Sequence, residues 1–174
     1  MRELPRKLFH LSGLLFHPLA LVLGDYRRLF FLSLLLAITL FETLRLTGCL
    51  RLPGRLSSLL REGEFRRPTG TFYYLWGVGL SFLLFPLKAA LCGLWVLALG
   101  DGISGLFGRG PLHHLVFFAL SLCVFLFFGL PFGGKILLLS GVLTLIEALP
   151  FPDDNLILPL ATALGVRILS SLPG

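Results

Sequence analysis

The feature that most constrains this chain is a succession of long apolar stretches with little polar sequence between them. The stretches cover residues 8–24, 29–49, 70–87, 89–108, 112–132, 135–150 and 156–172. A helix needs about 17 to 25 mostly apolar residues to cross the hydrocarbon core of a bilayer. The sequence therefore predicts an all-α protein, a polytopic transmembrane helical bundle of about seven spans, of which the last two are the shortest.

Composition agrees with this class. The chain has 174 residues, of which 56% are hydrophobic and only 14% charged, whereas soluble domains carry about 25% charged residues. The apolar ranges leave no room for a separate soluble domain, so we expect residues 1–174 to form a single integral membrane domain with one cytoplasmic loop at about 50–69. Three widely spaced cysteines, Cys49, Cys92 and Cys123, fit neither a disulfide framework nor a zinc site.

The basic residues set the predicted orientation. With seven spans, one face receives Arg2, Arg6, Lys7, Arg51, Arg55, Arg61, Arg66, Arg67 and Arg109, and the other receives Arg27, Arg28, Lys88 and Lys135. Because Lys and Arg are enriched in cytoplasmic loops, we expect a multi-pass protein of the plasma (inner) membrane whose N-terminus and 50–69 loop face the cytoplasm. The net charge of +6 is then explained by this topology and by anionic membrane lipids, and we expect no nucleic-acid partner.

The carboxylates gather on one predicted side of the membrane. Of the nine, all except Asp25 fall near the cytoplasmic side, where Arg6, Lys7, Arg61, Arg66 and Arg67 also lie. Ionisable residues in or beside a span cost about 2.5–3.5 kcal/mol on insertion scales and are therefore functional candidates. Carboxylates opposed by Arg and Lys suit a magnesium-bound polyphosphate, because carboxylates hold the metal while cations neutralise the phosphate oxygens.

Several of these residues also have a purely structural interpretation. Glu42 and Arg45 are three residues apart, so they share a helix face and can neutralise each other. Asp153 and Asp154 can form a solvated turn. Asp101 is a stronger candidate, because Gly100 and Gly102 on either side of it leave space for a backbone or a ligand. Glycines in membrane helices also serve close helix packing. The adjacent pair 113–114, two histidines, is interpreted as interfacial.

Five segments, in order, resemble the family of dolichol kinase, phytol kinase and CTP-dependent diacylglycerol kinase, the polyprenol kinase family, some of whose relatives are labelled phosphatidate cytidylyltransferase. The segments are "RKLFH" at 6–10, Glu42 with Arg45, "REGEFRRPTGTFYY" at 61–74, "ALGDGISGLFGRG" at 98–110 and "EALPFPDDNLILPLATA" at 147–163. The likeness covers roughly residues 6–163.

The resemblance implies a polytopic membrane enzyme that transfers the terminal phosphate of CTP, with Mg²⁺, to the hydroxyl of a lipid alcohol such as a polyprenol, a phytol-like alcohol or diacylglycerol. It implies catalytic roles for Asp101 and Glu147 and metal ligation by Asp101, Asp153 and Asp154. The residues implied in nucleotide or phosphate binding are Lys7, Arg66, Arg67, Thr69, Thr71, Gly100, Gly102 and Asn155.

One segment departs from the family pattern. Family members have a Lys-Ser-x-Glu-Gly-Ser-like segment after the Gly-Asp helix, whereas here residues 108–110, "GRG", run directly into "PLHHLVFF", and no glutamate lies between Asp101 and Glu147. A cytidylyltransferase-type lipid enzyme therefore stays open as an alternative, as does a non-catalytic membrane subunit or a small transporter. Transporters favour repeated halves and charges near the middle of the membrane, while these charges lie at one face. Lipid-dependent consumption of CTP would separate the enzymes from the other roles.

Overall fold

The computed structural model describes residues 3–50, 62–108, 110–149 and 153–171, with the backbone alone for 3–7 and 62. Within these ranges the protein is all-helical and has no β-strand. Helices occupy each of the seven apolar ranges, so the predicted all-α class is confirmed. Most of the predicted 50–69 loop lies outside the described residues, and its final part forms a 3₁₀ turn, η3 (Glu62–Phe65).

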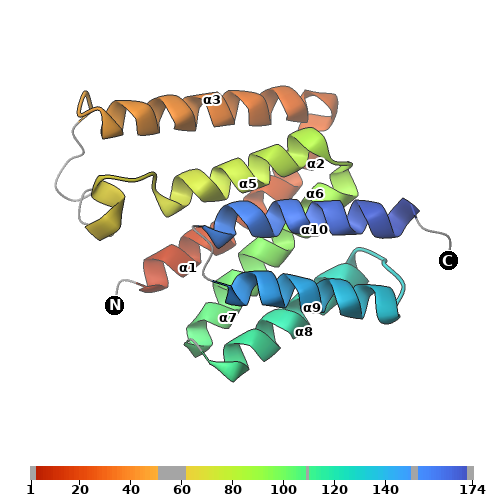
Figure 1. Cartoon of the computed structure of the whole chain (residues 1–174). Coiled ribbons are helices and arrows are strands. Elements are labelled where there is room, and N and C mark those ends of the chain that lie inside the picture. The colour runs from red at the N-terminus through yellow and green to blue at the C-terminus, as the bar shows by residue number, and fades with distance from the viewer. Residues whose placement is uncertain (1–2, 51–61, 109, 150–152, 172–174) are drawn as a thin grey trace.

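The chain begins with two short helices and then reverses. α1 (Glu3–Ser12) and α2 (Phe16–Leu23) are joined by a 3₁₀ turn, and α3 (Arg27–Leu46) returns along the molecule (Figure 1). The reversal occurs at Gly24, whose φ of +52° and ψ of −119° are accessible to glycine but strained for other residues. The sequence "GD" at 24–25 thus divides one long apolar region into two antiparallel pieces.

The remaining helices follow with short connections. They are α5 (Gly70–Leu84), α6 (Leu87–Trp95), the π-helical turn η4 (Val96–Asp101), α7 (Gly102–Ser104), the 3₁₀ turn η5 (Gly105–Phe107), α8 (Pro111–Phe127), α9 (Gly134–Ala148) and α10 (Asp154–Ser171). Thr69 starts α5 by accepting a hydrogen bond from the amide of Phe72. Pro111 starts α8 at a position where its missing N–H costs nothing.

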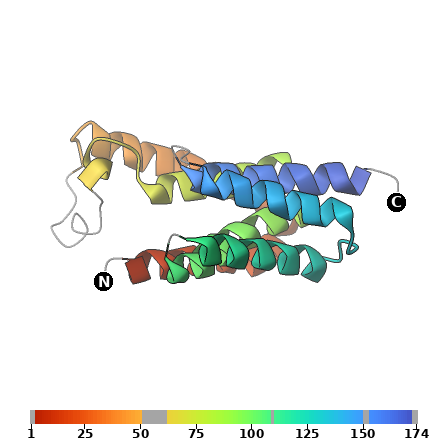
Figure 2. The same ribbon diagram turned by 60° about the horizontal axis from the view of Figure 1, so that its bottom comes forward.

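α10 is the central helix and packs against α5, α6 and α9. Glycines allow this close approach: an added Cβ at Gly77 would lie 2.4 Å from the carbonyl oxygen of Asn155, and one at Gly93 would lie 2.4 Å from that of Pro159. Pro159 has no N–H to donate to the carbonyl of Asn155 one turn earlier, and this carbonyl faces Gly77. In Figure 2, α1 (red) and α8 (teal) lie on the opposite side of the molecule from α3 (orange) and α10 (blue).

Two segments, Leu8–Leu46 and Leu87–Phe107, are long and apolar enough to cross a membrane, and Gly70–Leu84 and Pro111–Phe127 are shorter apolar helices. Large apolar side chains also lie exposed on the outer surface, including Leu15, Val22, Leu36, Phe127 and Leu138. Monomeric soluble proteins seldom expose apolar surface on this scale. These features favour a membrane protein, while the seven spans and their orientation stay predictions.

Candidate functional site

Asp101 ends the π-helical turn η4 and is buried. The wider turn interrupts the regular helix between α6 and α7, and single π-helical turns of this kind are frequent at functional sites. Oδ2 of Asp101 lies 3.0 Å from Nδ1 of His10 on α1. Side chains 91 positions apart in the sequence are thus brought into contact at one end of the bundle.

The two glycines beside Asp101 let other helices approach it. A Cβ at Gly100 would lie 2.8 Å from the ring of Phe117 on α8, and one at Gly102 would lie 3.4 Å from Leu11 on α1. The structure therefore gives Gly100 a packing role, whereas a side chain at position 102 would make ordinary van der Waals contact with Leu11. Phosphate binding by Gly100 and Gly102 stays a prediction.

His10 is held in place by α5. The hydroxyl of Tyr74 donates a hydrogen bond of 3.1 Å to the carbonyl oxygen of His10, and the two rings meet edge to face with centroids 5.0 Å apart. Gly13, one turn further on, leaves room for the same tyrosine, since an added Cβ would lie only 1.7 Å from its hydroxyl oxygen. The buried tyrosine thus fixes α1 against α5 at the level of Asp101.

Glu147, near the end of α9, contacts two histidines from the first turn of α8. Its Oε1 lies 2.6 Å from Nε2 of His113, and its Oε2 lies 3.0 Å from Nδ1 of His114. The interfacial position predicted for these histidines stays a prediction, but both of them also contact a carboxylate of the last motif. The sequence contains a signal for this contact. The predicted spans 112–132 and 135–150 are consecutive and antiparallel, so the start of the first, with the histidines, and the end of the second, with Glu147, lie on the same side of the membrane.

The two neighbouring aspartates at 153 and 154 have different surroundings. Oδ1 of Asp153 accepts hydrogen bonds from the side-chain amide of Asn155, at 2.7 Å, and from its backbone N–H, at 3.3 Å, so this carboxylate organises the start of α10. Burial raises the pKa of Asp154, and the negative charges of Asp101 and Glu147 raise it further. The carboxylate of Asp154 thus lies within electrostatic reach of Asp101 and Glu147.

We call His10, Asp101, His113, His114, Glu147 and Asp154 the acid–histidine cluster. Its members come from α1, η4, α8, α9 and α10, and in Figure 1 these elements meet at the end of the bundle where α10 begins. Three of the predicted site residues, Asp101, Glu147 and Asp154, are thus brought together. His10 belongs to the first of the five predicted segments, whereas His113 and His114 were not predicted as part of the site.

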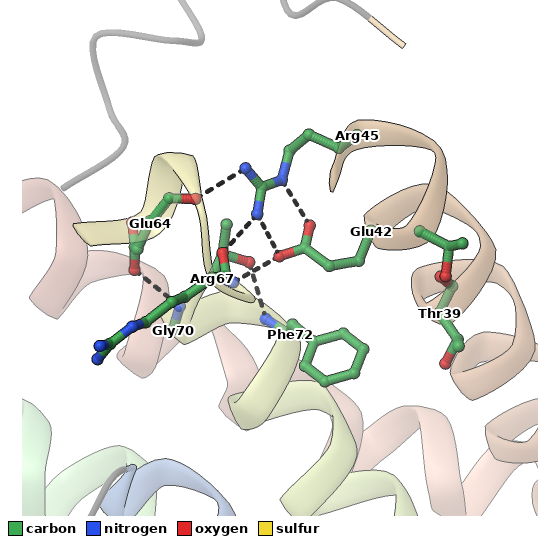
Figure 3. Close-up of polar contacts among 9 residues, drawn as sticks. Thr39, Glu42, Arg45, Glu64, Arg67, Gly70 and Phe72 are labelled. Atoms are coloured by element: carbon green, nitrogen blue, oxygen red, sulfur yellow. Dashed lines mark hydrogen bonds and ion pairs between the residues drawn. The ribbon is translucent and has the colours of Figure 1, made fainter. Parts of the chain in front are cut away.

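A second polar structure, shown in Figure 3, holds the loop before α5. The guanidinium of Arg45 binds both carboxylate oxygens of Glu42 at 2.8 Å and also donates to the carbonyl oxygens of Glu64, at 2.8 Å, and Arg67, at 2.7 Å. The amide of Thr69 donates to the same carboxylate of Glu42. Mutual neutralisation of Glu42 and Arg45 is thus confirmed, and the pair in addition ties α3 to the loop.

This loop and the first turn of α5 carry four of the eight predicted phosphate-binding residues. Arg66, Arg67 and Thr71 are exposed, while the Thr69 hydroxyl accepts from the backbone at the start of α5. The side chain of Lys7 lies outside the described residues. The loop adjoins the last motif, because a Cβ at Gly70 would lie 3.5 Å from Oε1 of Glu64 and 3.8 Å from Nδ2 of Asn155. The exposed arginines are therefore carried by a loop that borders the start of α10.

The electrostatics of the cluster suit a divalent cation. Three partly or fully buried carboxylates interact closely enough for two of them to raise the pKa of the third, and hard oxygen ligands of this kind are those that Mg²⁺ prefers. The donor chemistry of these carboxylates is therefore that of the predicted magnesium site, while the three described residues whose ligand atoms lie within 4.8 Å of one another are His113, His114 and Glu147.

Comparisons of the chain with protein-family models, with curated proteins and with solved structures give no match.

Proposed function

We propose that this protein is a membrane-embedded, CTP-dependent kinase that phosphorylates the hydroxyl of a lipid alcohol on the cytoplasmic side of the membrane. The observation that carries the proposal is the meeting of Asp101, Asp154 and Glu147 with His10 at one end of an apolar helix bundle. Buried like charges are costly unless a cation offsets them, so their gathering calls for a bound ion. A phosphate donor chelated to Mg²⁺ supplies that ion together with the phosphoryl group.

Asp101 and Asp154 are the residues that would hold Mg²⁺. A Mg²⁺ ion held there would offset the negative charge of the nucleotide phosphates. Asp153 supports this arrangement from outside, because it fixes Asn155 and the first turn of α10. Asn155 then offers its amide to a phosphate oxygen, a role that needs the turn to be rigid.

The pair formed by His10 and Asp101 receives the proton of the lipid hydroxyl. Their side chains lie 3.0 Å apart, so they can share a proton, and general base catalysis needs such a group within hydrogen-bond reach of the substrate. In the reaction the O–H bond of the alcohol breaks, its oxygen forms a bond to the γ-phosphorus, and the bond to the β-phosphate oxygen breaks to release CDP. Glu147 is less suited to this task because it already faces two histidines.

The loop before α5 supplies positive charge. Arg66 and Arg67, with Lys7 from α1, would spread the charge that develops on the transferred group, and Thr69 and Thr71 lie at the start of the helix that follows. Arg45 binds the carbonyl oxygens of residues 64 and 67. The ion pair of Glu42 and Arg45 thus fixes the backbone of the loop that carries Arg66 and Arg67.

An apolar groove of about 590 Å³ lies between α8 and α9 and offers a place for the lipid chain. Leucine, valine and phenylalanine side chains line most of it, among them Leu115, Phe118 and Leu138, and His114 of the acid–histidine cluster also lies on its wall. A lipid chain in this groove would bring its hydroxyl end towards the cluster. Apolar pockets with a few polar groups at one end are typical of lipid and cofactor sites.

The test is phosphate transfer by the purified protein in lipid nanodiscs. CTP or ATP labelled at the γ-phosphate would be supplied with Mg²⁺ and, in turn, a polyprenol, phytol and diacylglycerol. We expect label in a lipid product and its loss, by at least 100-fold, in Asp101→Asn. Asp25→Asn is the matched control, because it makes the same chemical change at an exposed carboxylate near the reversal between α2 and α3.

The alternatives give different outcomes in this assay. A cytidylyltransferase would release pyrophosphate and leave the cytidylyl group on the lipid, which α-labelled CTP detects. A transporter or a non-catalytic subunit would give no label from either nucleotide in any lipid. That last result, obtained with folded protein, would overturn the proposal.

A further inference from the structure

We propose that His113, His114 and Glu147 form a binding site for a transition-metal ion of the Zn²⁺ class, with an open coordination position beside the groove between α8 and α9. This site is distinct from the magnesium site of the proposed function, which rests on Asp101 and Asp154. One ligand atom from each of the three residues lies within 4.8 Å of the others. The inference therefore starts from the geometry of the three side chains.

The distances are those of a site ready to accept a small cation. Nε2 of His113 and Nδ1 of His114 lie 2.6 and 3.0 Å from the Glu147 carboxylate, which fits hydrogen bonds in the metal-free state. Tetrahedral zinc at about 2.0–2.1 Å from each ligand separates the ligand atoms by roughly 3.3 Å. Binding thus requires the His113 contact to open by about 0.7 Å and the His114 contact by about 0.3 Å.

Adjacent histidines converge because they use different ring nitrogens. Successive residues of a helix point about 100° apart, and the rings of His113 and His114 are nearly perpendicular, at 88°, with centroids 5.2 Å apart. His113 reaches Glu147 through its outer nitrogen Nε2, while His114 uses the inner nitrogen Nδ1. The difference in reach compensates for the difference in direction, so both nitrogens face one carboxylate.

The ligand set selects the class of metal. Two imidazoles and one carboxylate form a ligand set known from zinc enzymes, in which water or substrate takes the fourth position. Mg²⁺ prefers oxygen ligands and keeps several waters, whereas imidazole suits Zn²⁺, Co²⁺ and similar ions. The three residues therefore discriminate against the ion that Asp101 and Asp154 would hold.

Burial sets the direction of the open position. The side chains of His113 and Glu147 are 6% and 9% exposed, while that of His114 is 41% exposed. His114 also lines the apolar groove, so the accessible side of the site is the side of the groove. The fourth ligand is accordingly water or an oxygen atom, from a hydroxyl or a phosphate, of a molecule in that groove.

The surroundings predict a moderate affinity. Metal-binding histidines usually donate the second ring N–H to a partner, and loss of that partner weakens binding 10- to 100-fold. Nδ1 of His113 is buried and has no hydrogen-bond partner among the residues that the structure describes. We therefore expect dissociation constants in the micromolar range, well above those of closed structural zinc sites.

The experiment is a titration of metal-depleted protein with Co²⁺, followed by the visible d–d absorption of the bound ion, and competition with Zn²⁺. The protein carries an affinity tag without histidine. We expect one strongly absorbing Co²⁺ per chain, displaced by Zn²⁺ but not by excess Mg²⁺. His114→Ala should weaken binding at least 10-fold, and because this side chain is partly exposed the variant should still fold.

His17→Ala is the matched control, since His17 accepts a hydrogen bond from the Trp95 indole and belongs to no part of the cluster. Equal Co²⁺ affinity in His114→Ala and the unchanged protein, or no specific Co²⁺ spectrum at all, would overturn the proposal and leave a hydrogen-bonded triad. The titration contains neither nucleotide nor lipid alcohol. Its failure is therefore distinct from failure of the phosphate-transfer assay, which is run with Mg²⁺ alone.

Discussion

Removal of the Glu42 carboxylate charge tests how the loop before α5 is held. Glu42 is 2% exposed and the side chain of Arg45 is 6% exposed, so Glu42→Gln leaves a guanidinium buried without a counter-charge. Breaking one partner of a buried ion pair costs about 3–5 kcal/mol. The amide of Thr69 keeps an acceptor in the glutamine oxygen, so this figure refers to the ion pair alone.

The double variant Glu42→Met, Arg45→Met separates the cost of an unpaired charge from the worth of the pair. Apolar replacement of both partners removes the buried charge. The carbonyl oxygens of Glu64 and Arg67 then lose their guanidinium donor, and the amide of Thr69 loses its acceptor, at roughly 1 kcal/mol each. We therefore expect the double variant to lose about 3 kcal/mol and to be at least as stable as Glu42→Gln.

The assay is unfolding in mixed micelles of detergent and SDS, followed by tryptophan fluorescence. Trp76 is a suitable reporter because its indole donates to the Thr39 hydroxyl of α3 at 3.1 Å, so its environment changes when α3 and α5 separate. Asp25→Asn, at an exposed site, should stay within about 0.5 kcal/mol of the unchanged protein. A loss below about 1 kcal/mol for Glu42→Gln, or a double variant less stable than the single one, would refute the reasoning.

Two further predictions concern stability. Burial, and then the neighbouring carboxylates, raise the pKa of Asp154 in the folded state above its ordinary value of 3.8. Above pH 3.8 the folded protein therefore binds more protons than the unfolded chain, and its stability falls as the pH rises. With metal chelated, Asp154→Asn should raise the thermal unfolding temperature at pH 7, and this gain should vanish at low pH. Gly93→Ala should lower the free energy of unfolding by about 1–3 kcal/mol, because the added methyl group meets the backbone of α10. Gly141→Ala, in open space on α9, should leave it unchanged or raise it by up to about 1 kcal/mol. Equal effects of the two variants in SDS unfolding would contradict the packing described for α6 and α10.

The helices were predictable because their signal is local. Apolar length marks each one, and Gly24, Pro86 and Pro111 mark breaks that follow from backbone chemistry alone. The π-helical turn at Val96–Asp101 has no such local mark: it depends on how the neighbouring helices pack around it. Gly100 hints at this close packing but does not identify the partner, which is Phe117.

The candidate site was predictable in part for the same reason. Motif likeness and position near one face identified Asp101, Glu147 and Asp154, yet only the packing of α8 against α9 shows that Glu147 faces His113 and His114. Adjacent histidines on a helix diverge in direction, so the sequence favours separate surroundings for them. Convergence on one carboxylate depends on which ring nitrogen each uses, a detail that rotamers and tertiary contacts decide.

The two histidines lie in the one segment where the chain departs from the pattern of the family that its sequence resembles. Where that pattern has a Lys-Ser-x-Glu-Gly-Ser-like segment, this chain has "GRGPLHHL", with no carboxylate in it. The start of α8 instead has two imidazole rings, which contact Glu147. If Glu147 is committed to a nitrogen-rich metal site, Asp101 and Asp154 carry the magnesium chemistry alone, and added Zn²⁺ should change lipid phosphorylation through His114 rather than through Asp101.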